Sequence, residues 1–329
     1  MNQEELMQAL AYYLDEQRAL AAVLYFVLVE GQQRVIKRVD IEGNAQQSLR
    51  TRYVGSIRDT LVQNEELQVM PLSEADERRN AIYRYDLAQP IESLEVMRAV
   101  LQNNIRDEFR FDRDSLANLE GFIIVIGDEA HRIVLYKKNY PVNILQRDRF
   151  LLVPISNTRF VPAGQDAIML DKKFDFMLVE DRLFVIKLAT LERSFGYETA
   201  IMGQAQQTIA VIQSIALLAD MQPLLDLAAE LTNAKKLVKV RNSPVLQVPT
   251  ANVINFIRNH PKLTGRIHFS ADQTQITLDT GVSKKLFLKL LNDDYLFSQL
   301  TELQYDTIAK DKVVYWVRIY PLLHLLRIS

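Results

Sequence analysis

The chain has 329 residues, of which 48% are hydrophobic and 24% are charged, as in a typical folded globular protein. This length exceeds what one ordinary core holds, so we expect two domains or one elaborate one. The sequence has no cysteine, which excludes disulfides, thiolate catalysis and zinc sites built on cysteine, and which fits a reducing compartment.

No segment has the length and apolarity of a membrane span. The longest apolar run, residues 19–29, has 11 residues, whereas a transmembrane helix needs roughly 20. The first five residues are polar and acidic, unlike a secretory signal peptide. We therefore expect a cytoplasmic protein that associates with a membrane only peripherally, through a partner.

The first part of the chain mixes helices with a hairpin. Apolar side chains at helical spacing predict an amphipathic helix over residues 2–18, and two β-rich runs around a Gly-containing turn predict a hairpin. Further helices are expected over residues 44–66 and 91–102, the second opened by Pro90. The expected strands are 20–29, 34–41 and 82–85.

From residue 119 onward, short strands follow one another with turns between them, which is typical of an antiparallel sheet. Glu180 and Asp181 separate two of these strands and predict a tight hairpin turn. The expected strands are 122–126, 132–137, 150–153, a short one at 160, 168–170, 174–179 and 183–187.

The chain becomes mainly helical after residue 187. We therefore predict an α+β fold with an N-terminal hairpin-plus-helices region, a central antiparallel sheet and a mainly helical C-terminal region. The division is expected between residues 1–115 and 116–329. The elements predicted after residue 187 are helices 197–219, one opened by Pro223, 231–240, 253–259 and 284–291, and strands 276–278 and 313–317.

The net charge of −2 hides an uneven distribution. Residues 231–290 contain ten basic and two acidic side chains, a net charge of +8, so the remainder has −10. Such an uneven charge distribution attracts an anionic partner to one face of the protein. The candidate nucleic-acid contacts are Lys235, Lys236, Lys239, Arg241, Lys284, Lys285 and Lys289.

These lysines have a spacing that suits phosphate contacts. In a helix, Lys235, Lys236 and Lys239 share one side, and Lys284, Lys285 and Lys289 repeat a similar arrangement. Lysines so placed make the sequence-independent contacts that dominate nucleic-acid affinity. Aromatic residues are not interleaved with them, which favours duplex DNA over a single-strand stacking surface. The alternative is an ordinary solvated helix face.

No catalytic or metal motif is legible. Residues 128–131 spell Asp-Glu-Ala-His, the signature of some helicases, but the phosphate-binding GxxxxGK[ST] loop is missing, so we reject that interpretation. The four histidines, His131, His260, His268 and His324, lack metal-site spacing. We expect no cofactor, no metal and no enzyme activity.

Two alternatives stay open. A metal-dependent nuclease would use Asp171, Asp175 or Asp181 near Lys187, although the expected Glu-x-Lys element is absent. A protein-only scaffold would act through the long helix at 197–219 and bind no nucleic acid.

The stretch from Gly121 to Tyr197 carries a family resemblance. The hairpin over residues 122–137 is followed by Leu-Asp-x-x-Phe-Asp-Phe at 170–176, a second hairpin at 179–186 and Leu-Glu-Arg-Ser-Phe-Gly-Tyr at 191–197. This order resembles the KwaB family of the Kiwa anti-phage defence system. In these motifs we expect aromatic anchors at a sheet-to-helix corner and carboxylates such as Glu192 that cap turns or helix starts.

The resemblance implies a role in bacterial antiviral defence. It further implies a homodimer that binds double-stranded DNA and works with a small multi-pass membrane protein, KwaA. It carries over no catalytic residue, because the matching motifs are hydrophobic patterns.

Overall fold

The protein is described here by a computed structural model, which covers residues 1–76, 80–102, 105–140, 144–145, 152–154, 160–162, 167–297 and 304–306. They form two compact units. Unit 1 contains residues 1–210 and 225–239, and unit 2 contains residues 211–224 and 240–329. The strand predicted at 313–317 and His324 lie outside the described residues.

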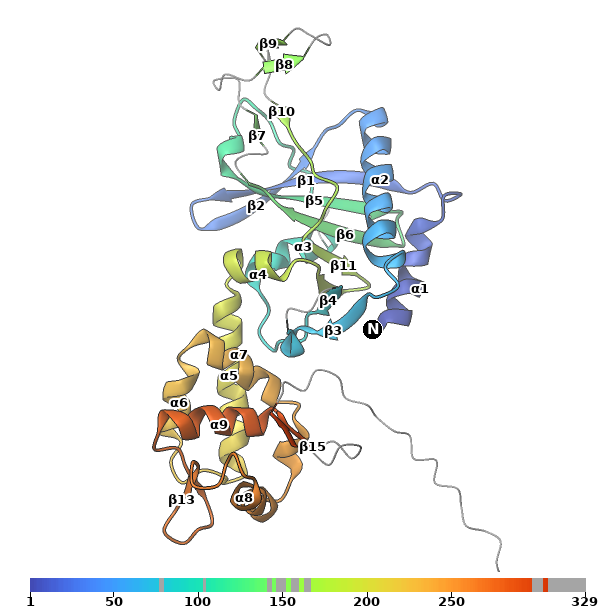
Figure 1. Ribbon diagram of the computed structural model, residues 1–329. Coiled ribbons are helices and arrows are strands. Elements are labelled where there is room, and N and C mark those ends of the chain that lie inside the picture. The colour runs from blue at the N-terminus through green and yellow to red at the C-terminus, as the bar shows by residue number, and fades with distance from the viewer. Residues whose placement is uncertain are drawn as a thin grey trace, which may run out of the picture. The chain divides into compact units, whose positions relative to one another are not determined.

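Unit 1 is built around one eight-stranded sheet with the order β2-β1-β5-β6-β11-β12-β4-β3 (Figure 1). Neighbouring strands are antiparallel except for the parallel pair β3–β4. The α+β fold with a central, mainly antiparallel sheet is therefore confirmed. The strands are β1 (Ala21–Glu30), β2 (Gln33–Val39), β3 (Gln68–Pro71), β4 (Ala81–Arg84), β5 (Leu119–Gly127), β6 (Arg132–Lys138), β11 (Phe176–Val179) and β12 (Arg182–Val185).

Two small two-stranded sheets of unit 1 lie outside this sheet. One pairs β7 (Ile144–Leu145) with β10 (Ala167–Ile168), and the other pairs β8 (Leu152–Pro154) with β9 (Phe160–Pro162). They account for the short strands that the sequence predicts near residues 150–153, 160 and 168.

Most helices between residues 1 and 240 were predicted from the sequence, but the helix predicted over residues 44–66 ends at Ile57, the one predicted over 197–219 ends at Ser214, and the helix at Leu188–Ser194 was not predicted. The chain also forms a π-helical turn at Arg58–Val62 directly after α2. The helices are α1 (Gln3–Leu14), α2 (Gly43–Ile57), α3 (Glu92–Gln102), α4 (Leu188–Ser194), α5 (Tyr197–Ser214), α6 (Gln222–Ala228) and α7 (Leu231–Val240).

The main core of unit 1 lies between the sheet and helices α1 and α2 (Figure 1). Leu10 of α1 and Tyr53 of α2 are buried there against alternate residues of β5, Phe122 and Ile124. Side chains of a strand alternate between the two faces of a sheet, so these residues share one face.

The opposite face of the sheet holds an aromatic cluster at the sheet-to-helix corner. Tyr136 of β6 and Phe176 of β11 pack edge-on against Phe195, with ring centroids 5.5 and 5.1 Å apart, and their own rings lie tilted at 5.7 Å. The aromatic anchors expected from the sequence motifs are thus present, and they attach the end of α4 to the sheet.

The turn between β11 and β12 has the geometry that its sequence predicts. Glu180 and Asp181 have φ of 49° and 58°, and positive φ at both central residues is what a two-residue type I′ hairpin requires.

The expected division at residue 115 does not coincide with the two units. β1 pairs with β5 along most of its length, from Ala21 opposite Gly127 to Leu28 opposite Leu119. Strands from both sides of residue 115 therefore form one sheet and share one core.

Unit 2 contains helices α8 (Thr250–Asn259) and α9 (Gly281–Leu291) and the hairpin of β13 (His268–Phe269) and β14 (Ile276–Thr277). A further hairpin joins β15 (Tyr295–Phe297) and β16 (Gln304–Asp306). Thr280 caps α9, because its side chain accepts a hydrogen bond from the Ser283 N–H while the Ser283 hydroxyl oxygen accepts one from the Thr280 N–H.

Candidate nucleic-acid interface

Helix α7 presents two lysines to solvent. It buries Ala234, Leu237 and Val238, and it leaves Lys236 exposed and Lys239 half-buried. The two lysines are three residues apart and therefore lie on neighbouring positions of one side of the helix. Within the described residues neither ammonium forms an ion pair.

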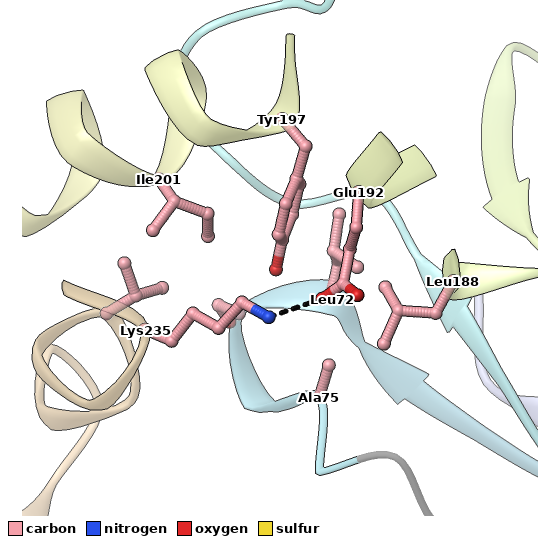
Figure 2. Close-up of a pocket in the computed structure, with 9 residues that line it drawn as sticks. Leu72, Ala75, Leu188, Glu192, Tyr197, Ile201 and Lys235 are labelled. Carbon is pink, nitrogen blue, oxygen red and sulfur yellow. Dashed lines mark hydrogen bonds and ion pairs between the residues drawn. The ribbon is translucent and has the colours of Figure 1, made fainter. Parts of the chain in front are cut away.

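The third lysine of α7 is engaged inside unit 1. The Lys235 ammonium forms an ion pair with the carboxylate of Glu192 on α4 (Figure 2). It also lies 5.8 Å from the centroid of the Tyr197 ring. The side chain of Lys235 is 33% exposed and that of Glu192 is 25% exposed. The sequence motif suggested that Glu192 caps a turn or a helix start. In the structure, Glu192 instead neutralises the charge of Lys235.

A small cavity surrounds this ion pair. Its volume is about 30 Å³, which is room for a water molecule. Burial raises the pKa of Tyr197 well above its ordinary value, with a smaller contribution from Glu192, so its hydroxyl stays protonated at neutral pH. The lining residues are Leu72, Ser73, Ala75, Leu188, Glu192, Tyr197, Ile201, Lys235 and Val238 (Figure 2).

The other predicted contacts belong to unit 2. Lys285 and Lys289 are exposed and four residues apart on α9, so they lie on one side of that helix, whereas Lys284 is half-buried. Arg241 is exposed immediately after α7. Each unit thus contains its own exposed basic group, and a single surface made by both groups stays a prediction.

Residues 128–131 form a turn rather than a nucleotide site. The Asp128 carboxylate accepts hydrogen bonds from the N–H groups of Ala130 and His131, at 2.9 and 2.7 Å, and from the Tyr12 hydroxyl. The Tyr12 hydroxyl, followed by the His131 N–H, lowers the pKa of Asp128 to about 2. Asp128 therefore closes the β5–β6 turn and attaches α1 to it.

The carboxylates of the nuclease alternative lie in three different environments. Asp175 is 1% exposed and lies 3.5 Å from the Lys137 ammonium, and its other oxygen accepts a hydrogen bond from the Lys138 N–H at 2.8 Å. Asp181 is 81% exposed and pairs with Arg98, and Asp171 is exposed. Across the part of the chain that the structure describes, no three His, Asp or Glu side chains gather as metal ligands would.

The Lys137–Asp175 pair was not expected from the sequence. Lys137 ends a run of apolar residues in β6, and its neighbour across the sheet becomes known only when β6 and β11 pair, with Tyr136 opposite Phe176. This pairing places the two charged residues next to each other in the interior of unit 1.

Two of the described histidines, His260 and His268, contact neighbouring side chains. His260 is buried and stacks on Phe256, with ring centroids 5.2 Å apart. The Nδ1 atom of His268 lies 2.6 Å from an Asp279 carboxylate oxygen. Among the helices of the described residues, none is long and apolar enough to span a bilayer.

Comparisons with known proteins agree on one family. A family model described as "Kiwa protein KwaB-like" matches residues 116–301, more than half of the chain. A protein named "Kiwa protein KwaB" from Escherichia coli O55:H7 (strain RM12579 / EPEC) is 27% identical over 283 residues, which cover 84% of this chain and 90% of that protein. No solved structure matches the chain.

Proposed function

Because the chain belongs to the Kiwa protein KwaB-like family, we propose that it is a component of a bacterial anti-phage defence system. Within that role, it acts by binding double-stranded DNA and not by catalysis. The family supports the defence context, and the basic side chains of α7 and α9 support the binding mode.

The observation on which DNA binding rests is the pair Lys236 and Lys239 on α7. Both ammonium groups lack an ion-pair partner within the described residues, and the helix beneath them is fixed by the fully buried Leu237 and Val238. A rigid helix that presents two neighbouring positive charges contacts consecutive phosphates without reading bases. Lys285 and Lys289 are two further exposed lysines, four residues apart on α9.

The experiment is a filter-binding salt series with duplex DNA. Each lost phosphate contact should make the log–log salt slope less negative by about 0.9. The double variant Lys236→Glu/Lys239→Glu should therefore make the slope less negative by roughly 1.8 and weaken binding to all sequences alike. A matched control is Arg52→Glu/Lys173→Glu, which makes the same change in net charge at two exposed positions without ion pairs among the described residues.

Two results would contradict the proposal. A flat salt response of the unchanged protein would remove duplex DNA as its ligand. Equal losses in the α7 variant and in the control variant would show that net charge alone, rather than α7, governs binding.

The assembly is proposed from the resemblance to KwaB proteins. The chain is expected to form a homodimer and to dock on the multi-pass membrane protein KwaA, which would bring it to the membrane as a peripheral component. Affinity purification of the membrane fraction after nuclease treatment tests this. A partner that stays bound without any DNA affinity in the salt series would favour the protein-only scaffold.

A further inference from the structure

The ion pair between α4 and α7 suggests a control on DNA binding, and this inference rests on the function proposed above. We propose that Glu192 is a built-in competitor for phosphate, whose carboxylate holds the Lys235 ammonium inside unit 1 and withholds it from DNA. In the unchanged protein, only two of the three lysines of α7, Lys236 and Lys239, then contact duplex DNA.

The position of α7 does not depend on this ion pair. Ala234, Leu237 and Val238 are at most 1% exposed, and burial of such side chains is the main source of helix docking energy. A partly exposed ion pair adds little to stability by comparison. The pair therefore decides where the charge of Lys235 is directed, not where the helix lies.

Lys235 is close enough to the other two lysines of α7 to join them. It precedes Lys239 by four residues, so the two side chains are neighbours along one side of α7. Its side chain is one-third exposed, and a lysine stem has enough rotatable bonds to turn its ammonium outward. Glu192 is the group that opposes this rotation.

Where it now lies, the Lys235 ammonium already has Glu192 as its anionic partner. The cavity around the ion pair has about 30 Å³, which suits a water molecule, and apolar Leu188 and Ile201 line it (Figure 2). Lys235 contacts DNA only after its ammonium leaves Glu192. While the carboxylate is charged, that exchange trades one anionic partner for another and gains little.

The test is Glu192→Gln, which keeps the shape of the side chain and removes its charge. Duplex affinity at low salt should rise by roughly threefold to tenfold, and the salt slope should become steeper by about 0.9, because one more lysine contacts phosphate. Lys235→Gln alone should leave affinity and slope nearly unchanged. Lys235→Gln in the Glu192→Gln background should abolish the gain.

Glu198→Gln is the matched control. Glu198 is exposed in the first turn of α5 and has no ion pair among the described residues, so its loss changes the net charge equally without releasing a lysine. A melting curve of each variant verifies that it is folded.

Three results would overturn the inference. They are an unchanged or weaker affinity of Glu192→Gln, a gain that survives loss of Lys235, and an equal steepening of the slope by Glu198→Gln. If the unchanged protein binds DNA with a steep slope, these results refute the role of Glu192 alone. Absence of binding by both the unchanged protein and Glu192→Gln refutes the proposed function and this inference together.

Discussion

Replacing Gly121 by alanine tests how tightly the aromatic corner of unit 1 is packed. A Cβ atom at Gly121 would lie 2.5 Å from Cζ of the Tyr136 ring and 2.9 Å from the backbone oxygen of Lys137, and it would clash directly with the Tyr136 hydroxyl. The ring cannot turn away easily, because Tyr136 is fully buried and packs against Phe176 and Phe195.

The expected loss follows from two opposing effects. Overpacking of a core usually costs about 1–3 kcal/mol, whereas replacing a strand glycine by alanine returns about 0.5–1 kcal/mol of backbone entropy. Gly121→Ala should therefore destabilise unit 1 by about 1–2 kcal/mol, which for a unit of this size lowers Tm by roughly 2–4 °C per kcal/mol.

Urea unfolding followed by far-UV circular dichroism measures this loss, and Gly55→Ala provides the control. Gly55 lies inside α2 with nothing within 4 Å of its would-be Cβ, so alanine there should stabilise by about 0.5–1 kcal/mol. Tyr136→Phe removes a buried hydroxyl that has no hydrogen-bond partner among the described residues and should reduce the cost of Gly121→Ala when the two are combined. A neutral or stabilising Gly121→Ala would refute the close approach of this ring to β5.

Two further outcomes test the charged groups of unit 1. Lys137→Met should lower the free energy of unfolding by about 3–5 kcal/mol, because it leaves the buried Asp175 carboxylate without its cation. The double variant Lys137→Met/Asp175→Leu should recover most of that stability in urea unfolding. A mild loss in the single variant would contradict a buried ion pair. Tyr12→Phe should move the pKa of Asp128 from about 2 toward its ordinary value in an NMR titration. A carboxyl group whose pKa is lowered in the folded state stabilises the fold above about pH 4, and this stabilisation is lost as the pH falls toward about 2. The free energy of unfolding of Tyr12→Phe should therefore depend less on pH between about pH 4 and 2. An unmoved pKa would show that the tyrosine hydroxyl is not the main cause.

Local patterns were sufficient to predict most secondary structure. The β1–β2 hairpin, the β11–β12 turn at Glu180 and Asp181, and helices α3 and α7 lie within a few residues of their predicted positions. These features depend on turn chemistry and apolar periodicity, which act over a few neighbouring residues.

Helix ends were less predictable. α5 was expected to reach residue 219 but ends at Ser214, and Ala216 then adopts a left-handed φ of 50°. The chain at Ala216 and Leu218 instead provides carbonyl oxygens that accept hydrogen bonds from the Gln275 side chain. The apolar residues after Ser214 continue a helical pattern in the sequence, but tertiary contacts from residues far along the chain determine where the helix stops.

By itself, the amino-acid sequence determined the α+β class, the approximate positions of most strands and helices, and the concentration of lysines in the C-terminal part. Only the tertiary structure decided that β1 pairs with β5 across the expected division, that Asp175 is buried against Lys137, and that Lys235 faces Glu192 while Lys236 faces solvent. The physical reason is that charge and periodicity belong to single segments, whereas burial and ion pairing depend on which distant segment packs against them.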